Sequence, residues 1–220
     1  MLVVKDLYKS FGEPATDVLK GISFSLPSKS FVSITGRSGS GKSTLLYSMS
    51  TLDSPTKGQV LLNGLNTSEM SEKQIHQFRN EKMGFVFQFH YLLPELTAIE
   101  NVLMPSRKTG QYQARYSRAK MLLNQFGLEG KGDRLPKHLS GGEQQRVAIA
   151  RSLIMEPEFL FADEPTGNLD SVNAETVMNI LKQVTRDHNT TVIYVTHDID
   201  FAEMADHKIR LVDGKIAEEK

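Results

Sequence analysis

The 220-residue sequence contains no cysteine, and its 26 Lys and Arg residues balance its 26 Asp and Glu residues. Without cysteine the chain has no disulfide framework, no thiolate metal site and no cysteine nucleophile, which suits a reducing compartment. A net charge of zero gives the whole protein no electrostatic attraction to nucleic acid or to an anionic membrane surface. We therefore expect a cytoplasmic protein with no nucleic-acid partner.

The sequence also lacks a long apolar segment. Lys5 and Asp6 interrupt the amino terminus where a secretory signal needs a continuous apolar stretch. The apolar runs at residues 159–162 and 192–195 have strand length and are far shorter than the ~20 residues that span a bilayer. We expect no signal peptide and no transmembrane segment, so a role at a membrane requires a partner protein.

The apolar residues that are present follow strand and helix periodicities in alternation. Residues 31–35, 159–163 and 191–196 are short apolar runs typical of buried strands. Buried apolar strands that alternate with amphipathic helices indicate an α/β protein with a mainly parallel sheet covered on both faces. Helical spacing occurs in three groups, which are Leu45, Leu46, Met49 and Leu52; Ala119, Leu122, Leu123 and Phe126; and Ala174, Val177, Met178, Leu181 and Val184.

The strand pattern fades in the middle of the sequence, between about Gln88 and Pro157. Thr97 with Glu100 predicts a capping box at a helix start in this part, which we interpret as an inserted helical subdomain. The sequence therefore predicts one domain over residues 1–220, with a catalytic core at 1–88 and 158–220 and a helical subdomain at 89–157. An Asp213-Gly214 pair predicts a hairpin turn that closes the core.

A glycine-rich loop follows the strand at residues 31–35 and precedes a helix. Its sequence, GRSGSGKST, fits the G-x-x-x-x-G-K-S phosphate loop, whose backbone N–H groups surround phosphate oxygens at a helix N-terminus. In this pattern Lys42 neutralises the β and γ phosphates, and the Ser43 hydroxyl binds Mg²⁺. A flexible Gly/Ser turn is the alternative, but the flanking strand and helix favour the phosphate loop. The candidate nucleotide-binding residues are Gly36, Arg37, Ser38, Gly39, Ser40, Gly41, Lys42, Ser43 and Thr44.

Two acids follow the apolar run of residues 159–162. A strand that buries this run delivers Asp163 and Glu164 at its carboxyl end, beside the phosphate loop. Because successive strand residues point to opposite sides, the two acids can have different roles. We expect Asp163 to hold Mg²⁺ through water and Glu164 to act as the general base. Acids at a strand end are more often a solvated edge, but the upstream phosphate loop favours the catalytic reading.

The sequence LSGGEQQR occupies residues 139–146. Ser140 and Glu143 have the spacing of a capping box, so one interpretation is simply a helix start preceded by flexible glycines. An uncovered helix N-terminus with Gly141 and Gly142 is also an anion site, and both interpretations can hold together. Many unrelated phosphate-loop proteins lack this motif, so it is the most discriminating signal in the sequence.

These motifs, in this order over residues 3–217, resemble the ATP-binding subunits of ATP-binding cassette (ABC) transporters. The resemblance implies an α/β P-loop NTPase fold of the ABC type, with a RecA-like core, an N-terminal antiparallel β subdomain and an inserted helical subdomain. It also implies a head-to-tail homodimer that binds ATP and Mg²⁺, in which the motif of one copy contacts ATP held by the phosphate loop of the other. The residues assigned to this contact are Ser140, Gly141, Gly142 and Glu143.

The resemblance also gives roles to residues beyond the phosphate loop. It implies that Gln88 touches Mg²⁺ and the attacking water, and that His197 contacts the γ phosphate and supports Glu164. The expected catalytic residues are then Glu164, His197 and Gln88, and the expected metal ligands are Ser43, Gln88 and Asp163. Residues 167–170, GNLD, resemble the family loop that connects the two composite sites, although Asp170 also suits a helix cap.

An aromatic residue stacks on adenine in this family. Phe11 lies at the corresponding distance before the phosphate loop, where tyrosine is the commoner residue. A phenyl ring retains the stacking face, so we expect binding to survive this difference. Tyr8 is close enough in the sequence to compete for the role.

The segment at residues 87–105 is the part most typical of one subgroup. It resembles the ATPases of lipoprotein-releasing complexes (LolD type), and more loosely the macrolide-exporter and cell-division ATPases of the same branch. The resemblance implies a peripheral protein on the cytoplasmic face of the inner membrane, with integral membrane permease subunits docking near Gln88 and the helical subdomain. The side chains expected to line a groove for a partner's short helix, or else to form subdomain core, are Phe85, Phe87, Phe89, Tyr91, Leu92 and Leu93.

Other functions stay open at this point. An ATPase of a macrolide or peptide exporter, or a regulator of a cell-division or cell-wall membrane partner that transports nothing, fits the same motifs. A soluble cassette ATPase of cofactor assembly or DNA maintenance is the remaining class. The DNA-maintenance class is disfavoured because its members carry long coiled-coil insertions, and this sequence has no heptad run.

Overall fold

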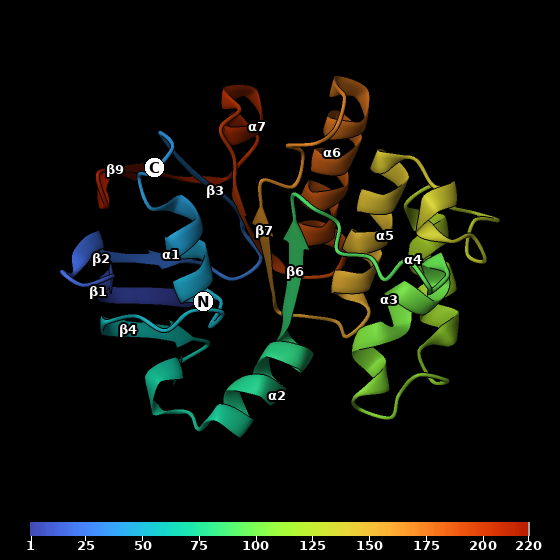
Figure 1. The fold of residues 1–220 in the computed structure, drawn as a ribbon, viewed down its shortest axis with the longest axis horizontal. Coiled ribbons are helices and arrows are strands. Elements are labelled where there is room, and N and C mark those ends of the chain that lie inside the picture. The colour runs from blue at the N-terminus through green and yellow to red at the C-terminus, as the bar shows by residue number, and fades with distance from the viewer. Residues whose placement is uncertain (220) are drawn as a thin grey trace.

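Two β-sheets and a group of helices make up the chain, which the computed structural model describes over residues 1–219 (Figure 1). The smaller sheet is antiparallel and has the strand order β2-β1-β4-β5. It is the antiparallel β subdomain that the family resemblance implied. Its strands are β1 (Leu2–Phe11), β2 (Thr16–Leu26), β4 (Lys57–Leu62) and β5 (Leu65–Asn66).

The larger sheet has the order β10-β9-β3-β8-β7-β6. Its neighbouring strands are parallel except for the pair formed by β9 and β10, which turns at Asp213-Gly214. The predicted, mainly parallel sheet and its closing hairpin are therefore confirmed. The strands are β3 (Phe31–Gly36), β6 (Met83–Phe87), β7 (Phe159–Asp163), β8 (Thr191–Val195), β9 (His207–Val212) and β10 (Lys215–Glu219).

Successive residues of the central strands β7 and β8 enter two different hydrophobic cores, because side chains alternate across a strand. Leu45 and Leu46 of α1 (Lys42–Met49) pack into one core, and Val147 of α5 (Gly141–Leu153) and Val177 of α6 (Ser171–Asp187) pack into the other. Both faces of the sheet are thus covered by helices. The residues on the α1 side are Phe159, Phe161, Ile193 and Val195, and those on the α5 and α6 side are Leu160, Ala162, Val192 and Tyr194.

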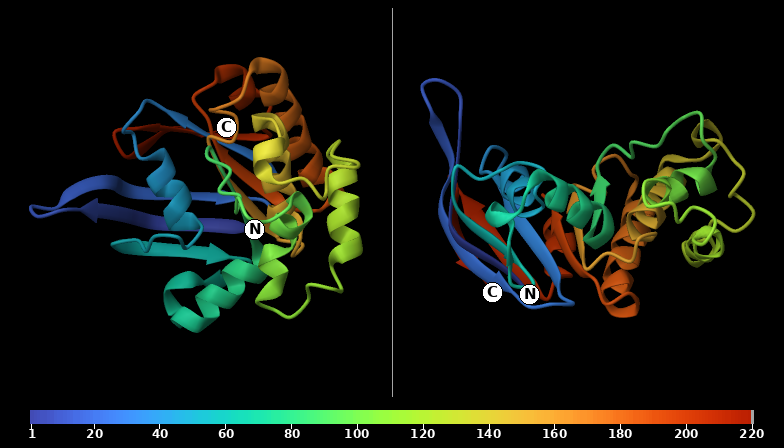
Figure 2. Two further views of the ribbon diagram at one scale, coloured as in Figure 1. Left: turned by 45° about the vertical axis from the view of Figure 1, so that its right-hand side comes forward. Right: turned by 90° about the horizontal axis from the view of Figure 1, so that it is seen from below.

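Helices occupy the part of the chain where strand character fades, and in Figure 2 α3, α4 and α5 lie away from β1 and β2. Thr97 with Glu100 and Ser140 with Glu143 form capping boxes, as predicted. No helix within residues 1–219 is both long and apolar enough to cross a membrane. The helices are α1 (Lys42–Met49), α2 (Glu72–Lys82), α3 (Ala98–Arg107), α4 (Tyr116–Gln125), α5 (Gly141–Leu153), α6 (Ser171–Asp187) and α7 (Ile199–Glu203).

The first helix is shorter than its apolar spacing predicts. Leu52, expected on the buried face, lies beyond the end of α1 and is 40% exposed. Thr51 has a φ of 59°, which turns the chain out of the helix, and the N–H groups of Leu52 and Asp53 both donate to the carbonyl oxygen of Tyr47. The turn therefore replaces a further turn of helix, and the prediction for Leu52 is wrong.

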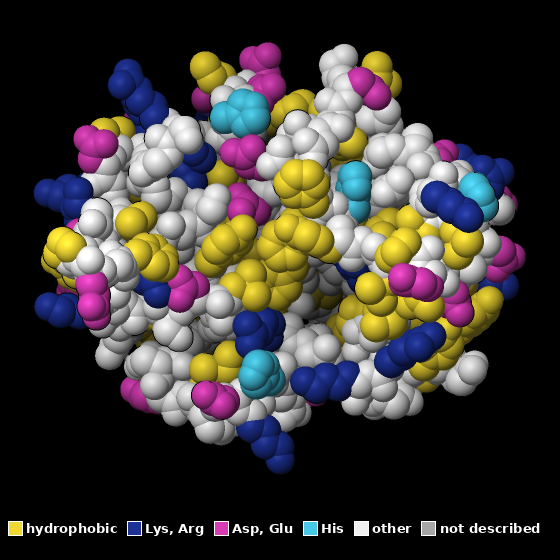
Figure 3. All heavy atoms as spheres, in the orientation of Figure 1, with side chains coloured by type: hydrophobic (Ala, Val, Ile, Leu, Met, Phe, Trp, Pro, Cys, Tyr) yellow, Lys and Arg dark blue, Asp and Glu magenta, His cyan; other side chains and the backbone are white. Residues whose placement is uncertain are grey.

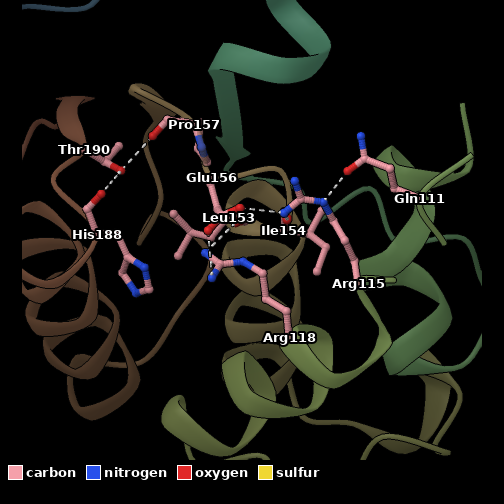
Figure 4. Close-up of polar contacts among 9 residues, drawn as sticks. All are labelled: Gln111, Arg115, Arg118, Leu153, Ile154, Glu156, Pro157, His188 and Thr190. Atoms are coloured by element: carbon pink, nitrogen blue, oxygen red, sulfur yellow. Dashed lines mark hydrogen bonds and ion pairs between the residues drawn. The ribbon is translucent and has the colours of Figure 1, made fainter. Parts of the chain in front are cut away.

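Arg118 of α4 and Arg115, the residue before this helix, join the helical group to the end of α5 (Figure 4). Arg115 Nη1 donates to the carbonyl oxygen of Ile154 at 2.7 Å and to Glu156 Oε2 at 2.8 Å, and Arg118 Nη2 donates to the carbonyl oxygen of Leu153 at 3.3 Å. The last carbonyl groups of a helix have no partner within it, so these arginines satisfy two such groups at the end of α5. The hydrogen bond from Arg115 lowers the pKa of the Glu156 carboxyl.

Candidate nucleotide-binding and catalytic site

The phosphate loop joins β3 to α1, with Arg37, Ser38 and Gly39 exposed. Gly36 has a φ of 149°, and a Cβ atom there would lie 2.4 Å from the carbonyl oxygen of Leu211, so only glycine fits this position. No side chain caps the N-terminus of α1, where Gly41 has left-handed backbone angles. The N–H groups of the first turn are therefore free to bind an anion.

Lys42 folds back over this loop. Its Nζ donates to the carbonyl oxygens of Gly36 at 3.0 Å and Arg37 at 3.1 Å, and the residue is 8% exposed. These two carbonyl partners hold the buried ammonium group in position. The loop, the helix N-terminus and the Lys42 ammonium group together form a candidate site for phosphate groups.

Two side chains of α1 contact Asp163 at the carboxyl end of β7. Ser43 Oγ lies 3.0 Å from Asp163 Oδ1, and Tyr47 Oη donates to Asp163 Oδ2 at 2.6 Å. Burial raises the pKa of the Tyr47 phenol, and the hydrogen bond to Asp163 raises it further. The phenol therefore stays protonated and acts as a donor. The hydroxyl of Ser43 and the carboxylate of Asp163 are oxygen ligands next to the phosphate loop, so the donor set fits Mg²⁺, which binds few protein groups and keeps several waters.

Glu164 follows Asp163 and lies beside His197. His197 Nδ1 is 3.5 Å from Glu164 Oε2, and the His197 side chain is 69% exposed. Glu164 has a φ of 46°, a left-handed conformation that is strained for a residue with a side chain. Its N–H donates to the carbonyl oxygen of Val195 at 3.2 Å, which fixes the end of β7 to β8. The sheet therefore brings the predicted general base and the predicted histidine together.

Gln88 follows β6, and the register of β6 with β7 pairs Phe87 with Asp163. Gln88 and Glu164 consequently lie at matching positions beyond adjacent strands. The Gln88 amide bonds to Asn168, with Nε2 3.2 Å from Asn168 Oδ1, and Asn168 Nδ2 donates to the Gln88 carbonyl oxygen at 3.1 Å. The structure thus joins Gln88 to the 167–170 loop.

The LSGGEQQR motif forms the start of α5, with Ser140 and Gly141 exposed. Glu143 forms a close ion pair with Lys131, and its other carboxylate oxygen accepts from the Ser140 N–H at 2.9 Å. The hydrogen bond from Lys131 is the main cause of a lowered Glu143 pKa, and the bond from the Ser140 N–H is the second. Lys131 also offsets the negative charge of Glu143 next to the helix N-terminus. Gly142 is buried against α6, where a Cβ atom would lie 2.1 Å from Asn173 Oδ1.

The motif and the phosphate loop of the same chain do not face each other. In Figure 1 α5 lies on the far side of β6 and β7 from α1. The chain therefore presents two separate candidate sites for phosphate, with exposed residues at 37–39 and at 140–141.

The two candidate adenine-stacking residues lie in the smaller sheet. Phe11 ends β1, is 47% exposed and has the Lys9 ammonium 4.8 Å from its ring centroid. Tyr8 is 39% exposed and lies over Gly21 of β2, where a Cβ atom would approach its hydroxyl to 2.8 Å. Tyr8 is held against the sheet, whereas Phe11 is the more accessible ring.

A groove of about 520 Å³ opens between α2 and the segment after β6. Figure 3 shows apolar side chains gathered on this face, with basic and histidine side chains below them. Of the predicted aromatic set, Phe85 and Leu92 pack against the cores, whereas Phe89, Tyr91 and Leu93 are exposed. Residues that line the groove include Phe85, Phe87, Tyr91, His76, Arg79, Lys108 and Arg151.

Arg151 of α5 fixes the shape of this groove. Its guanidinium donates to the carbonyl oxygens of His90 at 2.7 Å and Tyr91 at 2.6 Å. Tyr91 has a φ of 46°, and its ring meets that of Phe87 edge-on at 5.5 Å. The segment after Gln88 is therefore held by the helix that begins with the LSGGEQQR motif.

Sequence reasoning missed Tyr47, Lys131, Gln145 and Arg151. Their contacts depend on which elements are neighbours in the fold. For Tyr47 a local signal existed, because it lies four residues after Ser43 and therefore on the same face of α1. Gln145 lies within the LSGGEQQR motif, but that sequence does not indicate that its amide donates to the carbonyl oxygens of Phe87 and Pro165. For Lys131 and Arg151 no local pattern distinguishes them from ordinary polar residues.

Comparison with known proteins agrees with this geometry. The family model of the ABC transporters matches residues 19–167. The lipoprotein-releasing system ATP-binding protein LolD of Leptospira interrogans is 52% identical and aligns over 97% of this chain and 89% of its own length. LolD of Aquifex aeolicus is 51% identical, and the alignment covers 92% of this chain and 91% of that protein.

Solved structures show the same fold. A dimeric post-hydrolysis state of the ATP-binding cassette MJ0796, bound to ADP and Pi, has a TM-score of 0.89 at 39% identity and covers 100% of this chain and 98% of its own. CbiO1 of Clostridium perfringens, part of the ABC transporter complex CbiONQ, has a TM-score of 0.88 at 28% identity. The match covers 99% of this chain and 87% of CbiO1. The expected cassette fold is confirmed, and the protein is an ATP-binding, ABC-type ATPase. The chain belongs to the ABC transporter family.

Proposed function

We propose that the chain is the ATP-hydrolysing subunit of a lipoprotein-releasing complex at the inner membrane. It would lie on the cytoplasmic face and act through integral membrane permease subunits. The observation that carries the mechanism is the separation of two candidate phosphate-binding surfaces, one on the exposed phosphate loop at Ser38 and the other at Ser140. Two copies arranged head to tail bring these surfaces together over two ATP molecules.

The residues of one phosphate loop then bind and orient the nucleotide. Lys42 neutralises charge on the β and γ phosphates, the free N–H groups of α1 bind their oxygens, and Phe11 offers its ring to adenine. Ser43 and Asp163, with Gln88, would hold Mg²⁺. When bound, this ion draws charge from the transferred phosphoryl group.

Glu164 accepts the proton of the water that attacks the γ-phosphorus, and the bond from this phosphorus to the oxygen that bridges the β and γ phosphates breaks, which leaves ADP and phosphate. His197, 3.5 Å from the Glu164 carboxylate, orients that carboxylate and contacts the γ phosphate. Ser140, Gly141, Gly142 and Glu143 of the second copy cover the phosphate and exclude bulk water. Hydrolysis removes the group that bridges the copies, so the dimer reopens.

Cysteine pairs test the dimer, since the sequence contains no natural cysteine. Ser38→Cys on the phosphate loop and Gly141→Cys on the motif should crosslink between copies when ATP is present in a Glu164→Gln background. Glu129→Cys, exposed but outside the motif, replaces Gly141→Cys in the control and should not crosslink to Ser38→Cys. Absence of any intermolecular product at positions 38 and 141 would reject the head-to-tail arrangement.

The groove beside Gln88 supports the proposed contact with membrane subunits. Apolar rings suit the apolar face of a short helix, and Arg79, Lys108 and Arg151 place positive charge along its lining. Exposed Tyr91 is the strongest anchor on this surface, because large aromatic side chains dominate such contacts. Tyr91→Ala should weaken copurification of the membrane subunits and leave ATP binding by the isolated chain unchanged. Leu65→Ala, another exposed apolar residue, is the control.

Release of lipoprotein is tested with the chain and its membrane subunits reconstituted in proteoliposomes. ATP should drive the transfer of a membrane-anchored lipoprotein to a soluble acceptor, and Glu164→Gln should abolish the transfer. The similarity to LolD over nearly the whole chain favours this cargo. Movement of a macrolide or peptide instead, with no lipoprotein released, would assign the exporter function.

A further inference from the structure

Both oxygens of the Asp163 carboxylate have a partner on α1. Ser43 lies at Oδ1 and Tyr47 at Oδ2, at 3.0 and 2.6 Å, and the two residues are four apart on the same helix face. The Tyr47 ring packs against the hydrophobic core between α1 and the sheet. We propose that Tyr47 is a positioning residue of the magnesium site, whose hydroxyl keeps Asp163 Oδ1 turned toward Ser43.

The torsion that rotates an aspartate carboxylate is soft, so one contact alone does not fix its orientation. Two donors at opposite oxygens, both from one rigid helix, do fix it. Mg²⁺ demands near-ideal octahedral geometry and dehydrates reluctantly, so the direction of Oδ1 matters for this ion. This inference rests on the proposed assignment of Ser43 and Asp163 to the metal.

Tyr47 is itself held at both ends. Its carbonyl oxygen accepts from the N–H of Leu52 at 3.0 Å, the N–H of Asp53 at 3.2 Å and the Ser50 hydroxyl at 3.2 Å. The turn after α1 therefore anchors the main chain of Tyr47, while Asp163 holds its hydroxyl. A side chain fixed in this way can orient its partner rather than follow it.

Tyr47→Phe removes only the hydroxyl and keeps the packed ring. With Mn²⁺ as the probe, electron paramagnetic resonance should give a Mn²⁺ dissociation constant in the presence of ADP about 10-fold above that of the parent protein. The dissociation constant of ADP without metal should not change. In turnover, the Mg²⁺ concentration at half-maximal rate should rise by a similar factor, while the rate at saturating Mg²⁺ recovers.

The matched control is Tyr194→Phe. Tyr194 is buried, and its hydroxyl donates at 2.7 Å to the carbonyl oxygen of Phe201, away from the phosphate loop. Each variant loses a hydrogen bond that a tyrosine hydroxyl donates, so a loss of stability alone would affect both. Mn²⁺ affinity should fall in Tyr47→Phe and stay unchanged in Tyr194→Phe.

Asp163→Asn and Ser43→Ala separate this inference from the proposed function. If both weaken Mn²⁺ binding and Tyr47→Phe does not, the metal site stands and the role of Tyr47 is wrong. If Asp163→Asn binds Mn²⁺ as the parent does, the metal assignment itself fails, and the inference fails with it. Equal losses in the two tyrosine variants would also overturn the role of Tyr47.

Discussion

The side-chain amide of Gln145 bridges Phe87 and Pro165. Its Nε2 donates to the carbonyl oxygen of Pro165 at 2.6 Å and to that of Phe87 at 3.2 Å, and the residue is 1% exposed. Phe87 directly precedes Gln88, and Pro165 directly follows Glu164. One side chain of α5 therefore holds the ends of both segments that carry the proposed base and the proposed metal-contacting glutamine.

Replacing Gln145 with leucine should lower turnover without weakening ATP binding. The Gln88 and Glu164 backbones lose their common partner, and a misplacement of about 1 Å in such a site costs up to ~100-fold in rate. The phosphate loop is untouched, so the dissociation constant of ATP should stay within a factor of about two. Steady-state ATP hydrolysis and equilibrium nucleotide binding measure the two effects.

Asn101 is the control for that variant. It is also a buried amide, and its Nδ2 donates to the carbonyl oxygens of Leu93 at 3.1 Å, Leu96 at 3.0 Å and Thr97 at 3.1 Å. None of these three residues is next to a residue of the proposed site. Asn101→Leu should therefore reduce turnover much less, and an equal loss in both variants would show that Gln145 acts only through the stability of the fold.

Much of the fold could be predicted because its signals are local. The strands β3, β7 and β8 are continuous apolar runs, and the helix starts at Thr97 and Ser140 have complete capping boxes. Strand β1 is harder to predict from the sequence, because its pairing with β2 shifts register between Val4 and Leu7 and breaks the alternation of buried and exposed side chains. Helix α2 buries none of its residues, so it lacks the apolar stripe by which a helix is found.

The candidate site was predictable only where a motif is contiguous. The phosphate loop, Asp163 and Glu164 stand in recognisable local sequences, and parallel strands place their ends together. The positions of Tyr47 and Gln145 relative to the acids depend on how α1 and α5 pack on the sheet. No local pattern encodes that packing.

Glu164→Gln should abolish most turnover and keep ATP bound. Glutamine retains the size of the side chain but cannot accept the proton, so the rate should fall by roughly 10²–10⁴. Because the bridging γ phosphate then persists, ATP should drive the variant into a dimer that size-exclusion chromatography with light scattering detects. Unchanged turnover would remove Glu164 from the role of general base.

The hairpin turn at Gly214 supports the phosphate loop from behind. The Gly214 N–H donates to the carbonyl oxygen of Ser40 at 3.2 Å, and its carbonyl oxygen accepts from the N–H of Lys20 at 2.9 Å. A Cβ atom at Gly214 would lie 2.1 Å from the carbonyl oxygen of Val18, so Gly214→Ala must displace the turn. ATP affinity should fall by about 10-fold as the loop loses its preorganised shape, as measured by equilibrium binding.

Gly64→Ala separates this effect from backbone strain. Gly64 has a φ of 83°, close to the 78° of Gly214, and it follows Asn63 as Gly214 follows Asp213. A Cβ atom at Gly64 would meet no atom within 4 Å. Both variants should lose about 1–2 kcal/mol of folding free energy from the left-handed conformation. Only Gly214→Ala should lose ATP affinity. A similar loss in Gly64→Ala would show that the contact between Gly214 and the phosphate loop does not support ATP binding.

The ion pairs of Arg115 and Arg118 with Glu156 should make the free energy of unfolding depend on pH. The hydrogen bond from Arg115, with further help from Arg118, holds the Glu156 pKa below its ordinary value of 4.5 in the folded protein. This contribution is fully present above pH 4.5 and is lost as the pH falls through the lowered folded-state pKa. Because the Glu156 side chain is 59% exposed, the contribution should stay below about 1 kcal/mol.

Glu156→Gln tests this dependence without altering the left-handed backbone at position 156, where φ is 59°. The difference in unfolding free energy between the parent and Glu156→Gln, from urea titrations, should be constant near neutral pH and shrink on acidification. In an Arg115→Met background most of that difference should disappear at every pH, because the principal partner of the carboxylate is gone. A difference that persists undiminished in that background would assign the effect of Glu156 to the chain turn and not to the arginine.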